Sequence, residues 1–503
     1  MTAERTYLLR LSGDLSTKRG RAFAQFRGQL TRNLRAAMRD SGLTSRVDAK
    51  RNRFFVTAPE AAADPLRRVF GIQSFSAVEH RPWSSFDDLV QAGEELFTES
   101  VRGRSFAVRV RRSRIRGQVE WTAADLERAL GARLLPHAKK VDLTDPDVTA
   151  SIELDSGIAH LFSEVVPGAA GLPIGSEGRV LALISGGIDS AAAVWLLLKR
   201  GAQVDYLFYN LGGSDHENQV LEVVDVLVRQ WSYGYRPRLW LCDLRPWVDA
   251  IREHTSQRLW QVVLKRLMLR GGHAIAQRNG ALALVTGEAI GQVSSQTIEN
   301  LAAIESGAPI PVLRPLLGFD KGEIIELARR VGTYDLSAKV PEYCALHGRA
   351  PATAVHAAEL DSAEQAIDLE AFVAAVAESP RIDLRVRRRA ETDNVESLGV
   401  DHVPDGAVVI DLRSPTAFAA WHYPDALRMD YADALRAHAH VDVERTYLVC
   451  CEVEFKSADL AERMRGAGRR AHYFAGGTGK LLKWAAGRQL VDPASVVPAL
   501  REE

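Results

Sequence analysis

Cysteine is scarce in this sequence. Only Cys242, Cys344, Cys450 and Cys451 occur among the 503 residues. Four cysteines are too few to build a disulfide scaffold in a chain of this length. In a reducing compartment, a cysteine that has a role is therefore expected to be catalytic rather than structural.

Long apolar runs are also missing. No stretch approaches the ~20 consecutive apolar residues that cross a bilayer, so we expect no contact with a membrane. The start, Met1-Thr2-Ala3-Glu4-Arg5, lacks the basic and then apolar pattern of a secretory signal. These two absences predict a cytoplasmic protein. The Gly-Lys-Ser/Thr of a Walker loop is absent as well, so any phosphate-binding loop must be of another kind.

The charge balance is neutral overall but uneven along the chain. Up to residue 116 there are 23 basic against 12 acidic side chains, and the remainder holds 41 against 52. Seven arginines and no acidic residue fall between positions 101 and 116. A basic front of this kind is typical of a part that meets a polyanion such as RNA.

The length predicts several domains, because single cores rarely exceed roughly 250–300 residues. The front alternates like α+β structure, with strands expected at 5–12, 52–58 and 105–111 and a helix at 21–39. From Arg179 short apolar strands alternate with helices, which is typical of a doubly wound parallel sheet. We expect α+β domains at 1–60 and 61–165, a doubly wound α/β domain at 175–375, a linker at 376–403 and a final α/β domain at 404–503.

A glycine-containing turn, Ser185-Gly186-Gly187-Ile188-Asp189-Ser190, stands between a predicted buried strand and a predicted helix. Two glycines allow the backbone to approach an anion closely. Successive amides and the positive end of the helix can then hold phosphate. The serines can donate to phosphate oxygens, and Asp189 can hold Mg²⁺ or polarise its water. We therefore interpret the turn as a nucleotide-phosphate site, although a tight turn without a ligand would use the same glycines.

Two further segments place a cysteine on a loop. Pro341 enforces an extended approach to Cys344, and Cys450 and Cys451 follow a predicted strand and precede a helix. A cysteine beside a helix N-terminus has a lowered thiol pKa and is therefore more reactive. The alternative for such a cysteine is an incidental buried thiol without a function. Cys242 lies within an apolar strand, so we expect it to be a core residue.

These motifs carry a resemblance. Ser-Gly-Gly-Ile-Asp-Ser resembles the signature of PP-loop ATP pyrophosphatases, and nearly the whole chain resembles the bacterial tRNA 4-thiouridine sulfurtransferases, also called thiazole biosynthesis proteins. The resemblance implies an N-terminal ferredoxin-like domain, a THUMP RNA-binding domain, a PP-loop domain and a rhodanese-like domain with Asp411-Leu412-Arg413 after its first strand. Further segments that fit the family are Gln261–Arg266, Thr286–Glu288, Gly291–Thr297, Arg314–Leu316 and Asp320–Ile324.

The resemblance also implies residue roles. Leu183, Ile184, Lys265, Gly287 and Gln296 are expected to contact ATP, together with the loop from Ser185 to Ser190 and with Mg²⁺ as the accompanying ion. By the family spacing Cys-x5-Ser, counted back from Ser457, Cys451 is the persulfide carrier and Cys450 ends the strand. A glycine is usual where this chain has Glu454, which puts the strength of the rhodanese chemistry in doubt.

The implied reaction joins these parts. tRNA binds the front domains, ATP adenylates one uridine, and sulfur from a Cys451 persulfide replaces the activated oxygen. Cys344 then resolves the persulfide by forming a disulfide with Cys451. The implied partners are tRNA, a cysteine desulfurase and a sulfur-carrier protein of thiamine thiazole synthesis, and a homodimer would suit a long tRNA.

Two alternatives remain open from the sequence. Another PP-loop enzyme that modifies RNA would cleave ATP without needing Cys344 or Cys451. An RNA-binding protein with a degenerate rhodanese domain would neither cleave ATP nor transfer sulfur. The intact loop, with Lys265 and Gln296 in order, argues against this alternative.

Overall fold

The computed structural model describes residues 4–50, 53–112, 120–155, 157–340, 351–386, 398–452 and 455–488. The chain divides into two compact units. The first comprises Met1–Glu177 with Leu198–Ala202 and Gln230–Tyr235, and the second contains the rest from Gly178 onward. Throughout the described ranges, each helix is too short or too polar to cross a bilayer.

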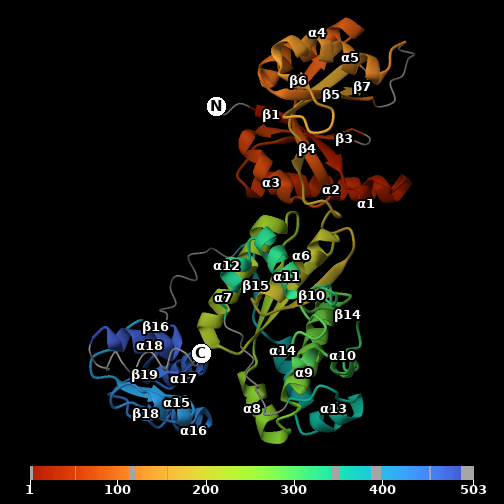
Figure 1. Ribbon diagram of the computed structural model, residues 1–503. Coiled ribbons are helices and arrows are strands. Elements are labelled where there is room, and N and C mark those ends of the chain that lie inside the picture. The colour runs from red at the N-terminus through yellow and green to blue at the C-terminus, as the bar shows by residue number, and fades with distance from the viewer. Residues whose placement is uncertain are drawn as a thin grey trace. The chain divides into compact units, whose positions relative to one another are not determined.

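The first unit is built on a nine-stranded sheet in the order β2-β3-β1-β4-β8-β7-β5-β6, with β9 beside β4. α2 (Gly20–Asp40) and α3 (Ala63–Arg68) accompany one half of this sheet, and α4 (Phe86–Val101) and α5 (Ala123–Leu134) pack together over the other half (Figure 1). The strands are β1 (Glu4–Leu11), β2 (Arg46–Lys50), β3 (Arg53–Pro59), β4 (Ile72–Pro82), β5 (Ser105–Arg112), β6 (Lys140–Val141), β7 (Val148–Asp155), β8 (Ile158–Phe162) and β9 (Val166–Pro167).

Local sequence explains these helices. α2 buries Phe26, Leu30, Leu34 and Met38, which recur at the spacing of one helix face. α4 and α5 each begin with a capping box, formed by Ser85 with Asp88 and by Thr122 with Asp125. The strands and the helix expected at the front of the chain are confirmed within one or two residues at each end.

The second unit contains a six-stranded sheet in the order β14-β13-β10-β11-β12-β15. Its first five strands run parallel and β15 pairs antiparallel with β12, so the expected doubly wound sheet is confirmed. The strands are β10 (Arg179–Ile184), β11 (Gln203–Asn210), β12 (Arg238–Asp243), β13 (Leu284–Val285), β14 (Val312–Leu313) and β15 (Arg381–Asp383). The helices that matter for the site are α6 (Ile188–Lys199), α7 (Gly213–Val226), α8 (Arg245–His254), α9 (Trp260–Asn279), α10 (Ile298–Glu305) and α11 (Lys321–Val331).

A separate five-stranded sheet follows in the same unit, in the order β16-β20-β19-β17-β18. All of its pairings are parallel. It consists of β16 (Gly399–Val400), β17 (Val408–Asp411), β18 (Leu427–Arg428), β19 (Thr446–Cys450) and β20 (Arg470–Phe474), with α17 (Phe455–Gly466) and α18 (Gly477–Ala486) packed on it.

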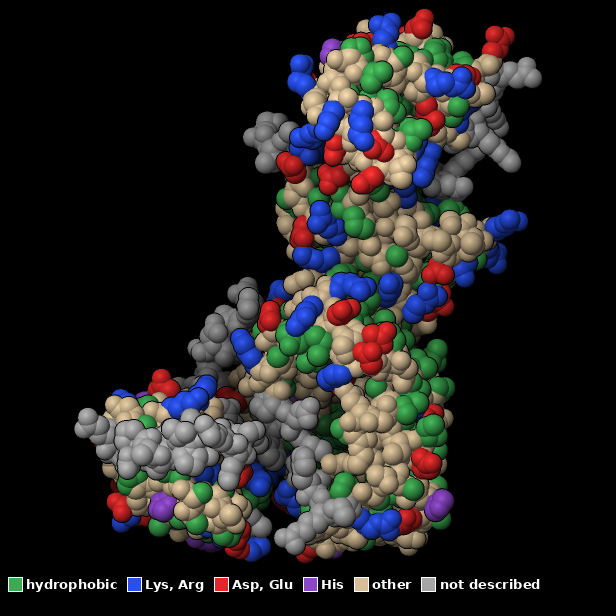
Figure 2. Space-filling view, in the orientation of Figure 1, with side chains coloured by type: hydrophobic (Ala, Val, Ile, Leu, Met, Phe, Trp, Pro, Cys, Tyr) green, Lys and Arg blue, Asp and Glu red, His purple; other side chains and the backbone are tan. Residues whose placement is uncertain are grey.

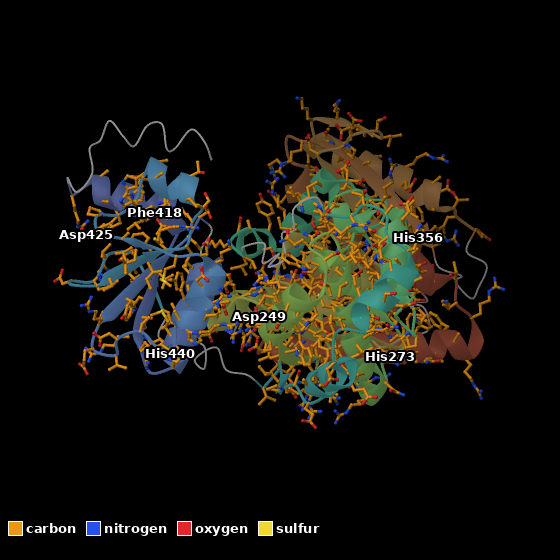
Figure 3. All side chains as sticks on the ribbon, turned by 90° about the horizontal axis from the view of Figure 1, so that it is seen from below. Asp249, His273, His356, Phe418, Asp425 and His440 are labelled. Atoms are coloured by element: carbon orange, nitrogen blue, oxygen red, sulfur yellow. The ribbon has the colours of Figure 1, made fainter. Side chains whose placement is uncertain are left out.

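α17 also contacts α7 and α8, which belong to the six-stranded sheet of the same unit. Arg245, at the start of α8, places its Nη1 3.2 Å from Asp459 Oδ1 and 3.1 Å from Glu462 Oε2. Glu462 Oε2 also accepts from the backbone N of Ser214 at 3.3 Å. Asp249, labelled in Figure 3, lies 3.7 Å from Arg463 across the same contact. Charged side chains therefore join the two sheets of this unit.

Candidate nucleotide site and sulfur loop

The glycine-containing turn lies where the sequence places it, between β10 and α6. Leu183 and Ile184 end the strand, with Ile184 buried and Leu183 packed on the central core. Ser190 Oγ donates to the carbonyl of Gly187 at 3.0 Å and lies 3.2 Å from Ser185 Oγ. These contacts close the loop on itself, and its amides precede the positive end of α6, which is the arrangement that binds phosphate.

Two glycines permit close backbone approach here. Gly186 has φ +78°, and a Cβ at this position would lie 2.8 Å from Val220 on α7. A Cβ on Gly287 would lie 2.7 Å from the carbonyl carbon of Asp189 and from the amide of Ser190. The loop after β13 therefore touches the phosphate-type loop directly, and no larger residue fits at Gly287.

Asp189 is paired across the loop. Lys321 Nζ, at the start of α11, lies 2.8 Å from Asp189 Oδ1. The sequence indicated both residues, but gave Lys321 no role. Within the described ranges, His, Cys, Asp and Glu side chains form no cluster of three that could hold a metal ion. Asp189 nevertheless suits Mg²⁺, which proteins commonly hold by one or two carboxylates together with substrate phosphates.

Glu288 is the centre of a second charged group. Its buried carboxylate accepts from Lys265 Nζ at 2.9 Å, from Arg314 Nε at 2.9 Å and from Thr286 Oγ1 at 3.0 Å. Burial raises the pKa of Glu288, but Lys265 and Arg314 together bring that pKa below its usual value. The carboxylate therefore stays ionised and holds both cations in place.

His216 lies in the first turn of α7, which packs beneath the loop. Its ring stands edge-on to Phe208 with centroids 4.7 Å apart. Burial lowers the pKa of His216 to about 3, against the opposing effect of a hydrogen bond with the Ser185 backbone. The imidazole is therefore neutral near neutral pH, and it supports the loop without adding charge.

The segment after Gly287 contributes Gln296 to the candidate site. Gln296 is 9% exposed, and its Oε1 has no hydrogen-bond partner in the described part of the chain. Ser294 lies 3.5 Å from Gln261, one turn before Lys265 on α9. A buried acceptor without a partner is costly, so Gln296 is suited to accept from a ligand such as an adenine amino group.

One topological fact brings these residues together. Ser185, Thr286 and Arg314 directly follow the parallel neighbours β10, β13 and β14. Parallel strands end at a common sheet edge, and open α/β sheets bind ligands there. Of the residues that the resemblance implied for ATP, Leu183, Ile184 and the loop from Ser185 to Ser190 lie at this edge, and Gly287 and Lys265 contact it through Asp189 and Glu288.

The sulfur loop follows β19 in the second sheet. Cys450 is the last strand residue and packs with Val409, Trp421 and Phe474. Cys451 faces the other side, is 1% exposed, and places its Sγ 3.2 Å from Ser457 Oγ on α17. Cys450 therefore lies in the core as expected, and Cys451 lies in the core of the opposite face, beside the start of a helix. Cys242 is also buried, and burial raises the pKa of its thiol to about 11.

Asp411 and Arg413 form a buried pair near this loop. Arg413 Nη2 lies 2.7 Å from Asp411 Oδ2 and donates to the Trp421 carbonyl. A Cβ on Gly477 would lie 2.3 Å from the Glu452 carbonyl oxygen, so α18 begins directly against the loop. Cys344 and Glu454 fall outside the described residues, so the proposed Cys344–Cys451 disulfide and the effect of Glu454 stay predictions.

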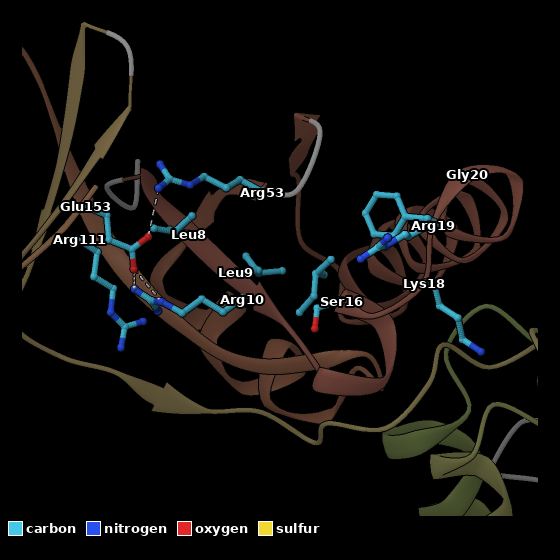
Figure 4. A pocket seen from close by; sticks show the side chains of 12 residues that line it. Leu8, Leu9, Arg10, Ser16, Lys18, Arg19, Gly20, Arg53, Arg111 and Glu153 are labelled. Atoms are coloured by element: carbon cyan, nitrogen blue, oxygen red, sulfur yellow. Dashed lines mark hydrogen bonds and ion pairs between the residues drawn. The ribbon is translucent and has the colours of Figure 1, made fainter. Parts of the chain in front are cut away.

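The basic front forms an open pocket of about 620 Å³ in the first unit (Figure 4). Arg10 Nε lies 2.9 Å from Glu153 Oε1, and Arg53 Nη2 lies 3.6 Å from Glu153 Oε2. The charged residues that line the pocket are five cations and one carboxylate: Arg10, Lys18, Arg19, Arg53, Arg111 and Glu153. This excess of positive charge suits an anionic ligand.

Of the five arginines described between residues 101 and 112, three are held by separate local contacts. Arg102 pairs with Glu99, and Arg109 and Arg112 donate to the carbonyls of Leu143 and Trp121. Only Arg111 of the described members lines the pocket, and Arg114 and Arg116 lie outside the described residues. On the face shown in Figure 2, basic and acidic side chains of the first unit are interspersed. Sequence reasoning missed Arg10, Arg53 and Glu153, because these come from strands far apart in the chain.

Sequence models of three protein families match the chain. They are the ThiI ferredoxin-like domain at residues 6–76, the THUMP domain at 84–164 and the thiamine biosynthesis protein ThiI at 175–369. The five-stranded sheet lies beyond the matched ranges.

Known proteins resemble the chain over most of its length. A tRNA sulfurtransferase of Pyrobaculum aerophilum is 38% identical over 92% of this chain and 94% of its own. One of Desulfurococcus amylolyticus is 34% identical over 96% and 98%. A solved 4-thiouridine synthetase–RNA complex with bound ATP matches with a TM-score of 0.67 at 30% identity, over 76% of this chain and 99% of that chain. The chain belongs to the tRNA sulfurtransferase (ThiI) family.

Proposed function

We propose that this protein is an ATP-dependent tRNA uridine 4-sulfurtransferase. The observation that carries the proposal is the nucleotide edge of the first parallel sheet, in a chain 38% identical to a tRNA sulfurtransferase over 92% of its length. The related 4-thiouridine synthetase was solved with RNA and ATP, which supports both ligands for this chain.

The first step is adenylation of the uridine. O4 of the uridine attacks the α-phosphorus of ATP, the O4–P bond forms, and the bond to the β-phosphate breaks to release pyrophosphate. The loop amides and the hydroxyls of Ser185 and Ser190 hold phosphate oxygens of ATP. Gln296 accepts a hydrogen bond from the adenine amino group. A Mg²⁺ held by Asp189 and the phosphates would neutralise charge on the leaving pyrophosphate.

The ion pairs at the site imply an exchange of partners. Lys321 is held by Asp189 and Lys265 by Glu288. A polyphosphate that enters supplies new acceptors for both amines, and Asp189 would then be able to hold Mg²⁺. The two carboxylates thereby hold the lysine amines in place, and the positive charges of these amines face the phosphates once the polyphosphate binds.

The second step transfers sulfur. The terminal sulfur of a Cys451 persulfide attacks C4, the C4–S bond forms, and AMP leaves with O4. Cys344 then attacks the Sγ of Cys451 in the C4–S–S–Cys451 intermediate, which releases 4-thiouridine and leaves a Cys344–Cys451 disulfide. A dithiol reductant is oxidised to restore both thiols.

The basic pocket of the first unit is the proposed contact for tRNA phosphates. Its five cations lie on a ferredoxin-like and a THUMP framework, and phosphate contacts dominate affinity for nucleic acids. We further propose a cysteine desulfurase as the sulfur donor, sulfur transfer to a carrier protein for thiamine thiazole, and a homodimer.

The rival function is a different PP-loop modification of RNA. It predicts that ATP cleavage continues at the full rate when Cys344 or Cys451 is replaced by serine. The position of Cys451 beside the start of α17, with its Sγ 3.2 Å from Ser457 Oγ, favours the sulfur-transfer mechanism instead, because a helix N-terminus stabilises a thiolate or persulfide anion.

The test is a reconstituted thiolation assay with unmodified tRNA, MgATP, a cysteine desulfurase and cysteine. Absorbance of the thionucleoside is followed for wild type, Asp189→Ala, Cys344→Ser, Cys451→Ser and Cys450→Ser. We expect activity in wild type and in Cys450→Ser alone. Full activity in Cys451→Ser contradicts the sulfur-carrier role, and full activity in Asp189→Ala contradicts the nucleotide site.

A further inference from the structure

Arg314 is the first residue after β14, at the edge where the nucleotide loops gather. The backbone N of Thr286 donates to the carbonyl of Leu313 at 3.1 Å, which joins this strand end to that of β13. The side chain of Arg314 is 5% exposed. A guanidinium so deeply buried at a ligand-binding edge needs acceptors for all of its donors.

The contacts of Arg314 are incomplete. Its Nε donates to Glu288 Oε2 at 2.9 Å, and its Nη1 donates to Glu305. Its Nη2 is buried and has no acceptor among the described residues. Two carboxylates therefore fix the plane of the guanidinium. The Nη2 group is held in place by this plane but has no acceptor of its own. An oxygen acceptor supplied by a ligand would complete the set.

The position of Glu288 indicates which ligand that is. Glu288 directly follows Gly287, where an added Cβ would lie 2.7 Å from the backbone of Asp189 and Ser190. Glu288 also holds Lys265 at 2.9 Å, so the two cations share one carboxylate. A planar guanidinium is well matched to oxygens of phosphate. The unmet donor therefore belongs to the same site as the phosphate-type loop.

We propose that Arg314 is a nucleotide-contacting residue that donates its Nη2 to an anionic oxygen of bound ATP. Glu288 and Glu305 are positioning residues that aim this donor. The inference rests on the proposed use of ATP, and it adds a contact from the β14 end to the loop contacts described above.

The test is calorimetric binding of a non-hydrolysable ATP analogue to the full chain as wild type, Arg314→Lys, Glu305→Gln and Arg238→Lys. Lysine keeps the charge but not the fork, so we expect Arg314→Lys to weaken binding about tenfold or more. Glu305→Gln loosens one anchor and should weaken it a few-fold. Arg238 begins β12 at the opposite sheet edge and bonds Asn279, so Arg238→Lys is the matched control and should bind as wild type.

Further arms separate the outcomes. AMP and pyrophosphate are each titrated, and the one whose affinity falls in Arg314→Lys identifies the oxygen that Nη2 contacts. Unchanged affinity for ATP, AMP and pyrophosphate in a folded Arg314→Lys overturns the inference. A crystal structure of the wild type with the analogue overturns it too if Nη2 contacts no nucleotide oxygen, whichever variants fold. If wild type itself fails to bind the analogue, the proposed function fails instead.

Discussion

Lys321 Nζ lies 2.8 Å from Asp189 Oδ1, although 132 residues separate them in the chain. The pair joins the start of α11 to the start of α6. Both side chains are partly exposed, at 48% and 26%. Because exposed pairs contribute about 0–1 kcal/mol to stability, the value of this pair must be sought in binding and catalysis.

Replacing either partner should therefore separate activity from stability. We expect Asp189→Ala and Lys321→Met each to reduce pyrophosphate release about a hundredfold or more, since the first removes the carboxylate proposed for Mg²⁺ and the second removes a cation that would meet the phosphates. The free energy of unfolding should change by less than about 1 kcal/mol. The exchanged double variant Asp189→Lys with Lys321→Asp restores the ion pair but not the site. Recovery of activity in that variant would show that only the pairing matters.

Glu288→Gln should lower stability. The amide keeps the shape of the side chain but leaves Lys265 and Arg314 without a shared negative charge, and breaking a buried pair costs about 3 kcal/mol. The pKa of Glu288 is lowered in the folded state, so its charge stabilises above the unfolded pKa of about 4.3 and this contribution is lost as the pH falls through the folded value. Urea unfolding should show wild type and variant converging as the pH is lowered below about 4. A constant difference at every pH would mean that the charge of Glu288 is not the cause.

The two adjacent cysteines should behave differently toward persulfide. After incubation with a desulfurase and cysteine, mass spectrometry should find one added sulfur atom on wild type and on Cys450→Ser. Cys451→Ser should gain none, because Cys450 packs in the core and burial raises the pKa of its thiol. Cys242→Ser is the control, since burial raises the pKa of Cys242 to about 11 and keeps it protonated. Sulfur found on Cys450 would reverse the assignment.

Arg245→Ala should loosen the contact between the two sheets of the second unit. Arg245 is bound by Asp243, Asp459 and Glu462 at 2.9 to 3.2 Å, and Asp459 has only 1% of its side chain exposed. Removal leaves a buried carboxylate with fewer partners. Hydrogen exchange of the α17 amides should become at least about tenfold faster, which corresponds to roughly 1.4 kcal/mol. Arg229→Ala, which removes an exposed pair with Asp225 on α7, should leave exchange in α17 unchanged.

His216 should make stability depend on pH. Burial holds the pKa of His216 at about 3, below the unfolded value of about 6.5. Its contribution is fully present above about pH 6.5 and is lost as the pH falls toward the folded pKa, with a slope of up to about 1.4 kcal/mol per pH unit. Wild type should therefore lose more stability than His216→Asn when the pH is lowered from about 7 to 5. Parallel losses in both proteins would exclude His216 as the source.

Local patterns in the sequence were sufficient for much of the fold. Periodic apolar residues predicted α2, and short apolar runs predicted β10 and β19, because burial of one face or of a whole strand is written in neighbouring residues. The glycine pair at Gly186 and Gly187 likewise predicted the turn between β10 and α6, whose role in binding nucleotide stays a prediction. The resemblance carried by these motifs also led to the correct family.

Contacts between distant segments were decided only by the tertiary structure. The sequence named Glu288, Arg314 and Lys321 without a role, since nothing local tells which carboxylate a buried cation will meet. Parallel strands separated by whole helices end at one sheet edge, and that edge brings Ser185, Thr286 and Arg314 together. Arg102, Arg109 and Arg112 of the arginine run made separate local contacts, while Arg111 came to line a pocket with Arg10, Arg53 and Glu153. The sequence by itself determined the elements and the loop, and the packing of those elements decided which charges face one another.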